Sequence, residues 1–85
     1  FAPFMHPDGQ HIIFASNMAD SLHKSMDFDL YMVKNDGTAL ERITFGPAFE
    51  SFPMFNRDGK KLVFASSRNG KSRYEINVFI ADWVQ

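Results

Sequence analysis

A chain of 85 residues buries only about 60 to 65% of the surface that its unfolded form exposes, but a content of 45% hydrophobic residues excludes a disordered chain. The net charge of -1 excludes a strong attraction to nucleic acid, and the lack of cysteine excludes disulfides, thiolate metal sites and a cysteine nucleophile. No apolar run approaches the roughly 20 residues that a membrane-spanning helix needs.

The first half of the sequence predicts four short strands, because its apolar runs are bounded by turn-forming residues. Between the first two strands, Gly9 can adopt the positive φ of a tight turn and the Asp8 carboxylate can accept backbone N–H groups. Asp36 and Gly37 give the same signal between the third and fourth strands. The predicted strands are Ala2–Met5, His11–Ser16, Asp29–Lys34 and Leu40–Thr44.

The second half repeats the first. Residues 3–17 align with residues 53–67 at an offset of 50, and after a loop the similarity resumes between residues 29–33 and 77–81 at an offset of 48. The identical pairs are Pro3 and Pro53, Asp8 and Asp58, Gly9 and Gly59, Phe14 and Phe64, Ala15 and Ala65, and Ser16 and Ser66. The second unit has only three predicted strands, Ser51–Phe55, Leu62–Ser66 and Ile76–Asp82, so its fourth strand is missing.

The inner strands are apolar on both sides, as in Ile12–Ala15 and Leu30–Val33, so we expect both faces of each sheet to be covered. Four-stranded units with a period of 40 to 50 residues are typical of β-propellers. The predicted fold class is all-β, built from antiparallel four-stranded propeller blades. Residues 1–48 form a complete blade, and residues 49–85 form a blade that lacks its fourth strand. A two-sheet sandwich is the alternative.

Residues 3–10 and 53–60 resemble the P-x-[WF]-S-P-D-G-K signature of TolB-like, WD-repeat-like propeller repeats. The sequence departs from this signature at His6 and Asn56, where serine is usual, and at Arg57, where proline is usual. The D-L-Y strand at Asp29–Tyr31 also resembles the family. The resemblance implies a C-terminal fragment of about two blades from a larger protein, in a periplasmic or extracellular setting.

The same resemblance implies a module that binds a protein, peptide or glycan, or serves as a scaffold. One alternative is the noncatalytic propeller portion of a larger hydrolase of the peptidase or amidohydrolase type, and another is a purely structural piece. We expect no enzyme activity, because no serine lies in a G-x-S-x-G nucleophile elbow and no base is tied to one by its spacing.

Imidazole and carboxylate groups could in principle hold zinc, nickel or manganese; the candidates are His6, His11, His23, Asp8, Asp27 and Asp29. His6 and His11 are five residues apart across a turn, so a shared face is not assured. We therefore expect solvated or capping histidines, with no metal, cofactor or catalytic site. Asp8 and Asp58 could form a carboxylate pair, but a structural role in the turns is favoured for Asp8, Gly9, Asp36, Gly37, Asp58 and Gly59.

The predicted loops of the second unit are basic, with Arg57, Lys60, Lys61, Arg68, Lys71 and Arg73, and those of the first are acidic, with Asp20, Asp27, Asp29 and Asp36. This asymmetry indicates a solvated surface, or one that orients a charged protein or peptide partner. Two uncovered apolar faces and an open strand edge predict self-association, strand swapping or coverage by further blades. Phe14 and Phe64 are predicted to occupy equivalent buried positions.

Overall fold

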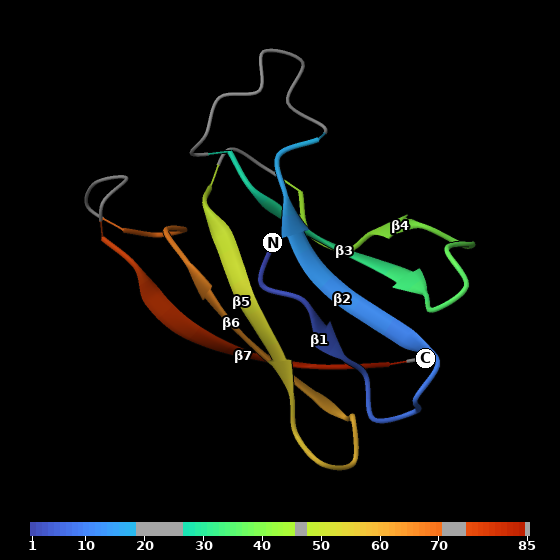
Figure 1. Ribbon diagram of the computed structural model, residues 1–85. Helices are drawn as coiled ribbons and strands as arrows, with labels where there is room; N and C mark the ends of the chain where they lie inside the picture. Colours follow the sequence, from blue (N-terminus) through green and yellow to red (C-terminus); the bar gives the residue numbers. More distant parts are fainter. Residues whose placement is uncertain (19–26, 46–47, 71–74, 85) are drawn as a thin grey trace.

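The computed structural model describes residues 1–18, 27–45, 48–70 and 75–84, and this part of the chain contains strands and no helix (Figure 1). The all-β prediction is therefore confirmed. None of the described residues forms a helix with the length and hydrophobicity to cross a membrane. The strands are β1 (Phe4–Met5), β2 (His11–Ser16), β3 (Asp29–Lys34), β4 (Glu41–Arg42), β5 (Glu50–Phe55), β6 (Lys61–Ser66) and β7 (Asn77–Asp82).

The strands form two antiparallel sheets, one in the order β1-β2-β3-β4 and one in the order β5-β6-β7. The predicted succession of a four-stranded and a three-stranded unit is confirmed for the described residues. The fourth strand is shorter than expected because the chain leaves the ladder after Arg42. Beyond that point Ile43 N–H donates to the Leu30 carbonyl at 2.8 Å, and the Thr44 hydroxyl accepts the Leu30 N–H at 2.9 Å.

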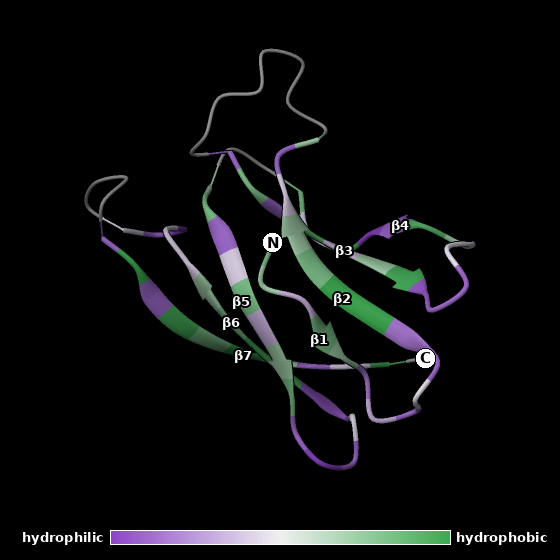
Figure 2. Cartoon of the chain, viewed as in Figure 1, coloured by the Kyte–Doolittle hydropathy of each residue, from purple (hydrophilic) through white to green (hydrophobic). Residues whose placement is uncertain are grey.

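The core lies between the two sheets, where β5 packs across β2 and β3. One face of the first sheet lies against one face of the second (Figures 1 and 2), and most of the apolar residues between them are buried. The first sheet contributes Ile13, Ala15, Leu30 and Met32, and the second contributes Phe55, Leu62 and Phe64. At about 25 cal/mol for each Å² of apolar surface buried, this contact is the main stabilising interaction between the sheets.

Two ion pairs are partly or wholly withdrawn from water. Asp29 is only 3% exposed, and its carboxylate accepts from the Arg42 guanidinium at 2.6 Å. Burial raises the pKa of Asp29, although the Arg42 hydrogen bond opposes the shift. Glu50 is buried and accepts from the Ser66 hydroxyl at 2.6 Å and from Arg68 Nε at 2.7 Å. Asp29 and Arg68 are thus not the solvated loop charges that the sequence predicted, because each is held against a partner of opposite charge.

Phenylalanine rings join the sheets near the N-terminus. Phe1 lies 5.0 Å from Phe28 and 5.8 Å from Phe52 between ring centroids. Phe52 has a φ of 52° within a bulge of β5, where the register shifts between Ser51 and Met54. A positive φ is unusual for a bulky residue. The bulge therefore allows Phe52 to contact Phe1 while β5 continues to pair with β6.

Phe14 and Phe64 occupy equivalent strand positions but differ in burial. Phe14 stacks on Tyr31 with centroids 5.9 Å apart and planes at 21°, and Phe64 stacks on Phe79 at 5.8 Å and 19°. Phe64 is 5% exposed and lies in the core between the sheets. Phe14 lies on the opposite face of the first sheet and is only partly buried. The prediction of equal burial is wrong, because the second sheet covers the other face of β2.

We expect Phe64→Ala to lower the free energy of unfolding by about 3 to 5 kcal/mol, because it leaves a cavity in the core. Phe14→Ala should cost roughly half as much, since a partly exposed ring loses less transfer free energy. Urea unfolding at a protein concentration where the midpoint is concentration-independent measures both. Equal losses for the two variants would contradict the assignment of buried and free faces.

Candidate functional site

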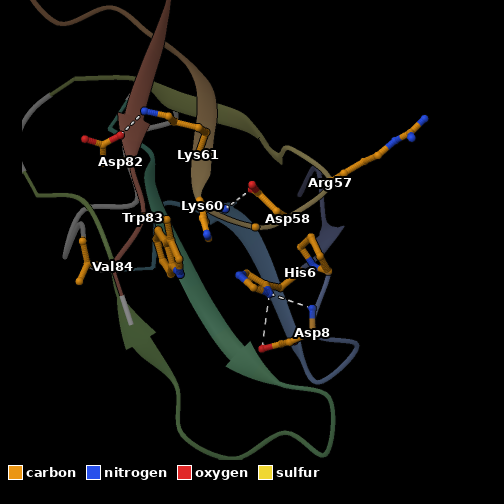
Figure 3. A pocket seen from close by; sticks show the side chains of 11 residues that line it. His6, Asp8, Arg57, Asp58, Lys60, Lys61, Asp82, Trp83 and Val84 are labelled. Atoms are coloured by element: carbon orange, nitrogen blue, oxygen red, sulfur yellow. Dashed lines mark hydrogen bonds and ion pairs between the residues drawn. The ribbon is translucent and has the colours of Figure 1, made fainter.

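A cavity of about 870 Å³ opens at the end of the molecule where the two repeated turns meet (Figure 3). Its walls come from the β1–β2 turn, the β5–β6 turn and the chain that follows β7. The lining residues are His6, Pro7, Asp8, Arg57, Asp58, Gly59, Lys60, Lys61, Asp82, Trp83 and Val84. The repeat in the sequence thus brings both turns to one site.

The β1–β2 turn is closed by backbone and side-chain hydrogen bonds. Gly9 N–H donates to the His6 carbonyl at 2.9 Å, and Gly9 has a φ of 72°. The Asp8 carboxylate accepts the N–H groups of Gln10 at 2.8 Å and His11 at 3.1 Å. The Asp8 carboxylate thus gives a partner to backbone N–H groups of the turn that have none in the pairing of β1 with β2.

The Asp8 carboxyl group has a pKa well below its ordinary value. The Gln10 N–H, opposed by a smaller effect of burial and reinforced by His11 and His6, lowers the pKa of Asp8 to about 2. His11 Nδ1 lies 2.7 Å from the carboxylate. Asp8 N–H in turn donates to His6 Nδ1 at 3.0 Å, so Nδ1 of His6 acts as an acceptor. Asp8 is therefore held ionised as part of the turn.

The β5–β6 turn has the same backbone geometry. Gly59 has a φ of 71° and donates its N–H to the Asn56 carbonyl at 3.0 Å. Asp58 accepts the Lys60 N–H at 2.9 Å, and the Asn56 side-chain oxygen accepts the Lys61 N–H at 3.0 Å. Asn56, which replaces the serine of the repeat signature, therefore stabilises its turn with its own side chain.

The two turns pack directly on one another through His6 and Gly59. His6 is only 4% exposed and its ring lies 4.4 Å from that of Phe55. A Cβ on Gly59 would lie 2.9 Å from His6 Cε1, which is closer than real Cβ atoms come. Of the two expected roles, solvated or capping, His6 has the capping one: it accepts the Asp8 N–H of its own turn, and its buried ring fills the space beside Gly59.

Trp83 forms the aromatic wall of the cavity. Its backbone N–H donates to the Lys60 carbonyl at 2.8 Å. The centroid of its ring lies 5.0 Å from that of Phe55 and 6.2 Å from that of His6. The indole N–H is buried and has no acceptor within the described ranges. Sequence analysis missed this residue. At the offset of 48, Trp83 aligns with Asn35, whose backbone N–H makes the matching bond to the Gln10 carbonyl at 2.8 Å. Because the two residue types differ, the repeat gives no signal for an aromatic residue at this position.

The charges at the cavity are only partly paired. Lys61 and Asp82 form an ion pair, which raises the pKa of Lys61 and lowers that of Asp82. Neither Lys60 nor Arg57 forms an ion pair with any residue that the structure describes. Arg57 points away from the other lining side chains, whereas Lys60 lies between Asp58 and Trp83 (Figure 3). Lys60 is thus the cation best placed to meet a ligand.

The predicted turn between β3 and β4 lies beside the β1–β2 turn. Asp36 accepts the Thr38 N–H at 2.9 Å and the Thr38 hydroxyl at 2.6 Å, and these bonds lower the pKa of Asp36. Gly37 has a φ of 88°. The Asn35 side-chain amide donates to the Gly9 carbonyl at 3.3 Å. The turn at Asp36 and Gly37 is therefore tied to the β1–β2 turn and does not line the cavity.

The metal-ligand candidates that the structure describes do not assemble into one cluster. His6 and His11 flank Asp8, but Asp29 is paired with Arg42. His23 lies outside the described residues, as do Asp20, Lys71 and Arg73 of the charged loops. Within the described ranges, no group of three or more histidine and carboxylate side chains has an arrangement that could hold a metal ion.

The chain is similar in sequence to a known bacterial protein. The chain is 35% identical over 65 residues to the protein TolB homolog of Chlorobium luteolum. The match covers 76% of this chain and 14% of that relative, so the chain spans a small part of its length. No family model matches the chain. The similarity supports a TolB-like relation and agrees with the all-β fold.

We expect Gly59→Ala to destabilise the fold more than Gly9→Ala. Both substitutions place a side chain at positive φ, at a cost of about 1 to 2 kcal/mol. Gly9 has open space around the new Cβ, but at Gly59 the Cβ meets the buried His6 ring, which adds about 1 to 3 kcal/mol of overpacking. Urea unfolding of the two variants is the measurement. Equal costs would show that the His6 ring moves aside freely.

The lowered pKa of Asp8 predicts a pH-dependent stability difference between the wild type and Asp8→Asn. The carboxylate stabilises the fold fully above its unfolded pKa near 3.9, and this contribution is lost as the pH falls towards the folded value of about 2. The wild type should exceed the variant in stability at pH 5, and the difference should shrink towards pH 2. A difference that does not change between these pH values would refute the assignment.

Proposed function

We propose that this chain is a noncatalytic protein-binding module of a TolB-like β-propeller. Residues 1–48 form one blade, and residues 49–85 form a second blade that lacks its fourth strand. Two observations support the proposal: the similarity to a TolB homolog, and the packing of one antiparallel sheet on the face of the next. In propellers, successive sheets pack face to face around an axis.

The cavity between the two turns is the observation that best supports binding. Its volume of about 870 Å³ lies within the range of ligand-binding clefts, which combine apolar walls with a few polar groups. Trp83 supplies an aromatic surface, and Lys60 supplies a cation that no described carboxylate neutralises. A peptide segment with an acidic side chain fits this combination, because a carboxylate pairs with an ammonium group and an apolar neighbour packs on indole.

In this proposal, the aspartate and glycine residues of the three turns have a structural role. Asp8 and Asp58 accept backbone N–H groups, and Gly9 and Gly59 adopt the positive φ that each turn requires. Because both turns end in the cavity wall, their rigidity would fix the shape of the binding site. Asp36 and Gly37 would act indirectly, by supporting the first turn.

The TolB-like relation also supports an extracytoplasmic bacterial setting, either periplasmic or extracellular. The alternative, a noncatalytic propeller portion of a larger peptidase or amidohydrolase, receives no support of its own from the comparisons. No described residue favours that alternative over a binding module.

Selection from a displayed random-peptide library, followed by titration of the enriched peptides, tests the proposal. We expect enriched peptides to contain Asp or Glu next to an apolar residue. Lys60→Glu should weaken their binding about tenfold or more, because it replaces the attracting charge with a repelling one.

Lys34→Glu is the matched control, because it makes the same change of charge at an exposed lysine outside the cavity. It should leave the affinity within about twofold of the wild type, which is the usual effect of a distant surface charge. Equal losses for both variants, or amide shift changes on binding that map away from Trp83, would reject the cavity as the site.

A further inference from the structure

A second cavity, of about 520 Å³, shares Trp83 and Val84 with the cavity between the turns. The chain that follows β7 runs toward the start of β2 and brings both residues to the first sheet (Figure 1). The rest of the lining comes from β2, β3, β4 and the residue next to β4, and consists of His11, Met32, Glu41 and Ile43. The volume lies within the range of ligand-binding clefts.

The strand register places the first-sheet side chains of this cavity on one face. Residues directly opposite each other in an antiparallel pair share a face, as do residues two apart along a strand. Met32 lies opposite Ile13 of β2 and opposite Glu41 of β4. His11 precedes Ile13 by two positions, so it lies on the same face. Because Ile13 and Met32 belong to the core between the sheets, the floor of the cavity continues the core face of the first sheet.

This cavity combines an apolar floor with a negative charge. Met32 is buried and Ile43 packs partly against the core, so both offer apolar surface. Glu41 is exposed and forms no ion pair with the residues that the structure describes. Of the neighbouring cations, Arg42 is held by its own ion pair and Lys34 does not line the cavity. Among the described lining residues, Glu41 alone carries a full charge.

The imidazole of His11 is fixed so that it can accept a hydrogen bond from a ligand. Its Nδ1 lies 2.7 Å from the Asp8 carboxylate, which is ionised in the folded chain. An ionised carboxylate only accepts, so Nδ1 carries the proton of the neutral ring and Nε2 is the acceptor. Nε2 of His11 and the Glu41 carboxylate therefore offer two acceptors at one cavity.

We propose that this cavity binds an arginine side chain of a protein or peptide partner. A guanidinium group has several N–H donors and no acceptor, which suits a carboxylate and an imidazole Nε2. Its planar face stacks on indole, here that of Trp83, and its aliphatic stem packs on apolar side chains such as Met32 and Ile43. This goes beyond the acidic ligand proposed for the first cavity. Neither cavity needs the other to be occupied, so the two proposals can fail independently.

NMR titration of the full chain with the capped tripeptide acetyl-Ala-Arg-Ala-amide tests the proposal. At about pH 8, where imidazole is usually neutral, we expect shifts of the Glu41 and Ile43 amides and of the Met32 methyl group. The amides of Arg57 and Asp58, which line only the first cavity, should not shift. The same tripeptide with citrulline in place of arginine keeps the shape and loses the charge. It should bind about threefold more weakly or less tightly still.

Glu41→Gln should weaken binding of the arginine peptide about three- to fivefold, because it removes an exposed charge and keeps the side-chain size. Glu75→Gln is the matched control, since it makes the same change at an exposed glutamate outside both cavities, and it should leave the affinity unchanged. Glu41→Gln should not weaken the acidic peptides that Lys60→Glu weakens, which separates the two sites.

Equal affinities for the arginine and citrulline peptides would overturn the proposal. So would equal effects of the two glutamate substitutions, shifts confined to Arg57 and Asp58, or a spectrum that the arginine peptide does not change.

Discussion

The structure depends on the contact between one apolar face of β2 and β3 and the opposing face of β5 and β6. Without the other sheet, each sheet would expose the apolar residues that now lie between the two. An isolated two-stranded hairpin is marginally stable at best in water, and larger sheets need a packed hydrophobic face for stability, which each sheet here obtains from the other. Ile13 and Leu30 are fully inaccessible at the centre of this contact, with Phe64 packed on them from the second sheet.

Two buried carboxylates accompany this apolar contact, and each is held by partners in its own sheet. Glu50 is buried with its carboxylate held by Ser66 and Arg68, and Asp29 is held by Arg42. Removing one partner of a buried pair leaves an uncompensated charge, which destabilises far more than loss of a surface pair. Each pair joins neighbouring strands of one sheet, Asp29 and Arg42 in the first and Glu50 and Arg68 in the second. The pairs thus add little attraction between the sheets, but they oppose a shift of strand register within each sheet, because such a shift would separate the charges.

Strand positions and the number of sheets could be predicted from the sequence, because apolar runs and Asp-Gly turns are local signals. The burial of His6 and the place of Trp83 could not, since both depend on contacts between the repeat units and not within one. Phe14 illustrates the same limit: its repeat position equals that of Phe64, but its burial depends on which face has a neighbour. Asp29 and Arg68 appeared to be loop charges because their partners lie far along the chain.

The packing of His6 beside Gly59 limits the modularity of the repeat. Equivalent segments of a repeat protein can usually be exchanged, because each unit meets its neighbour through the same kind of surface. Here the first turn has an imidazole where the second has Asn56, and that imidazole fills the space that the missing Cβ of Gly59 leaves open. Copying the second turn into the first would empty this space. Copying the first into the second would leave the new imidazole without a glycine partner. The two units have therefore become a matched pair at this end, and their order in the chain is fixed by shape.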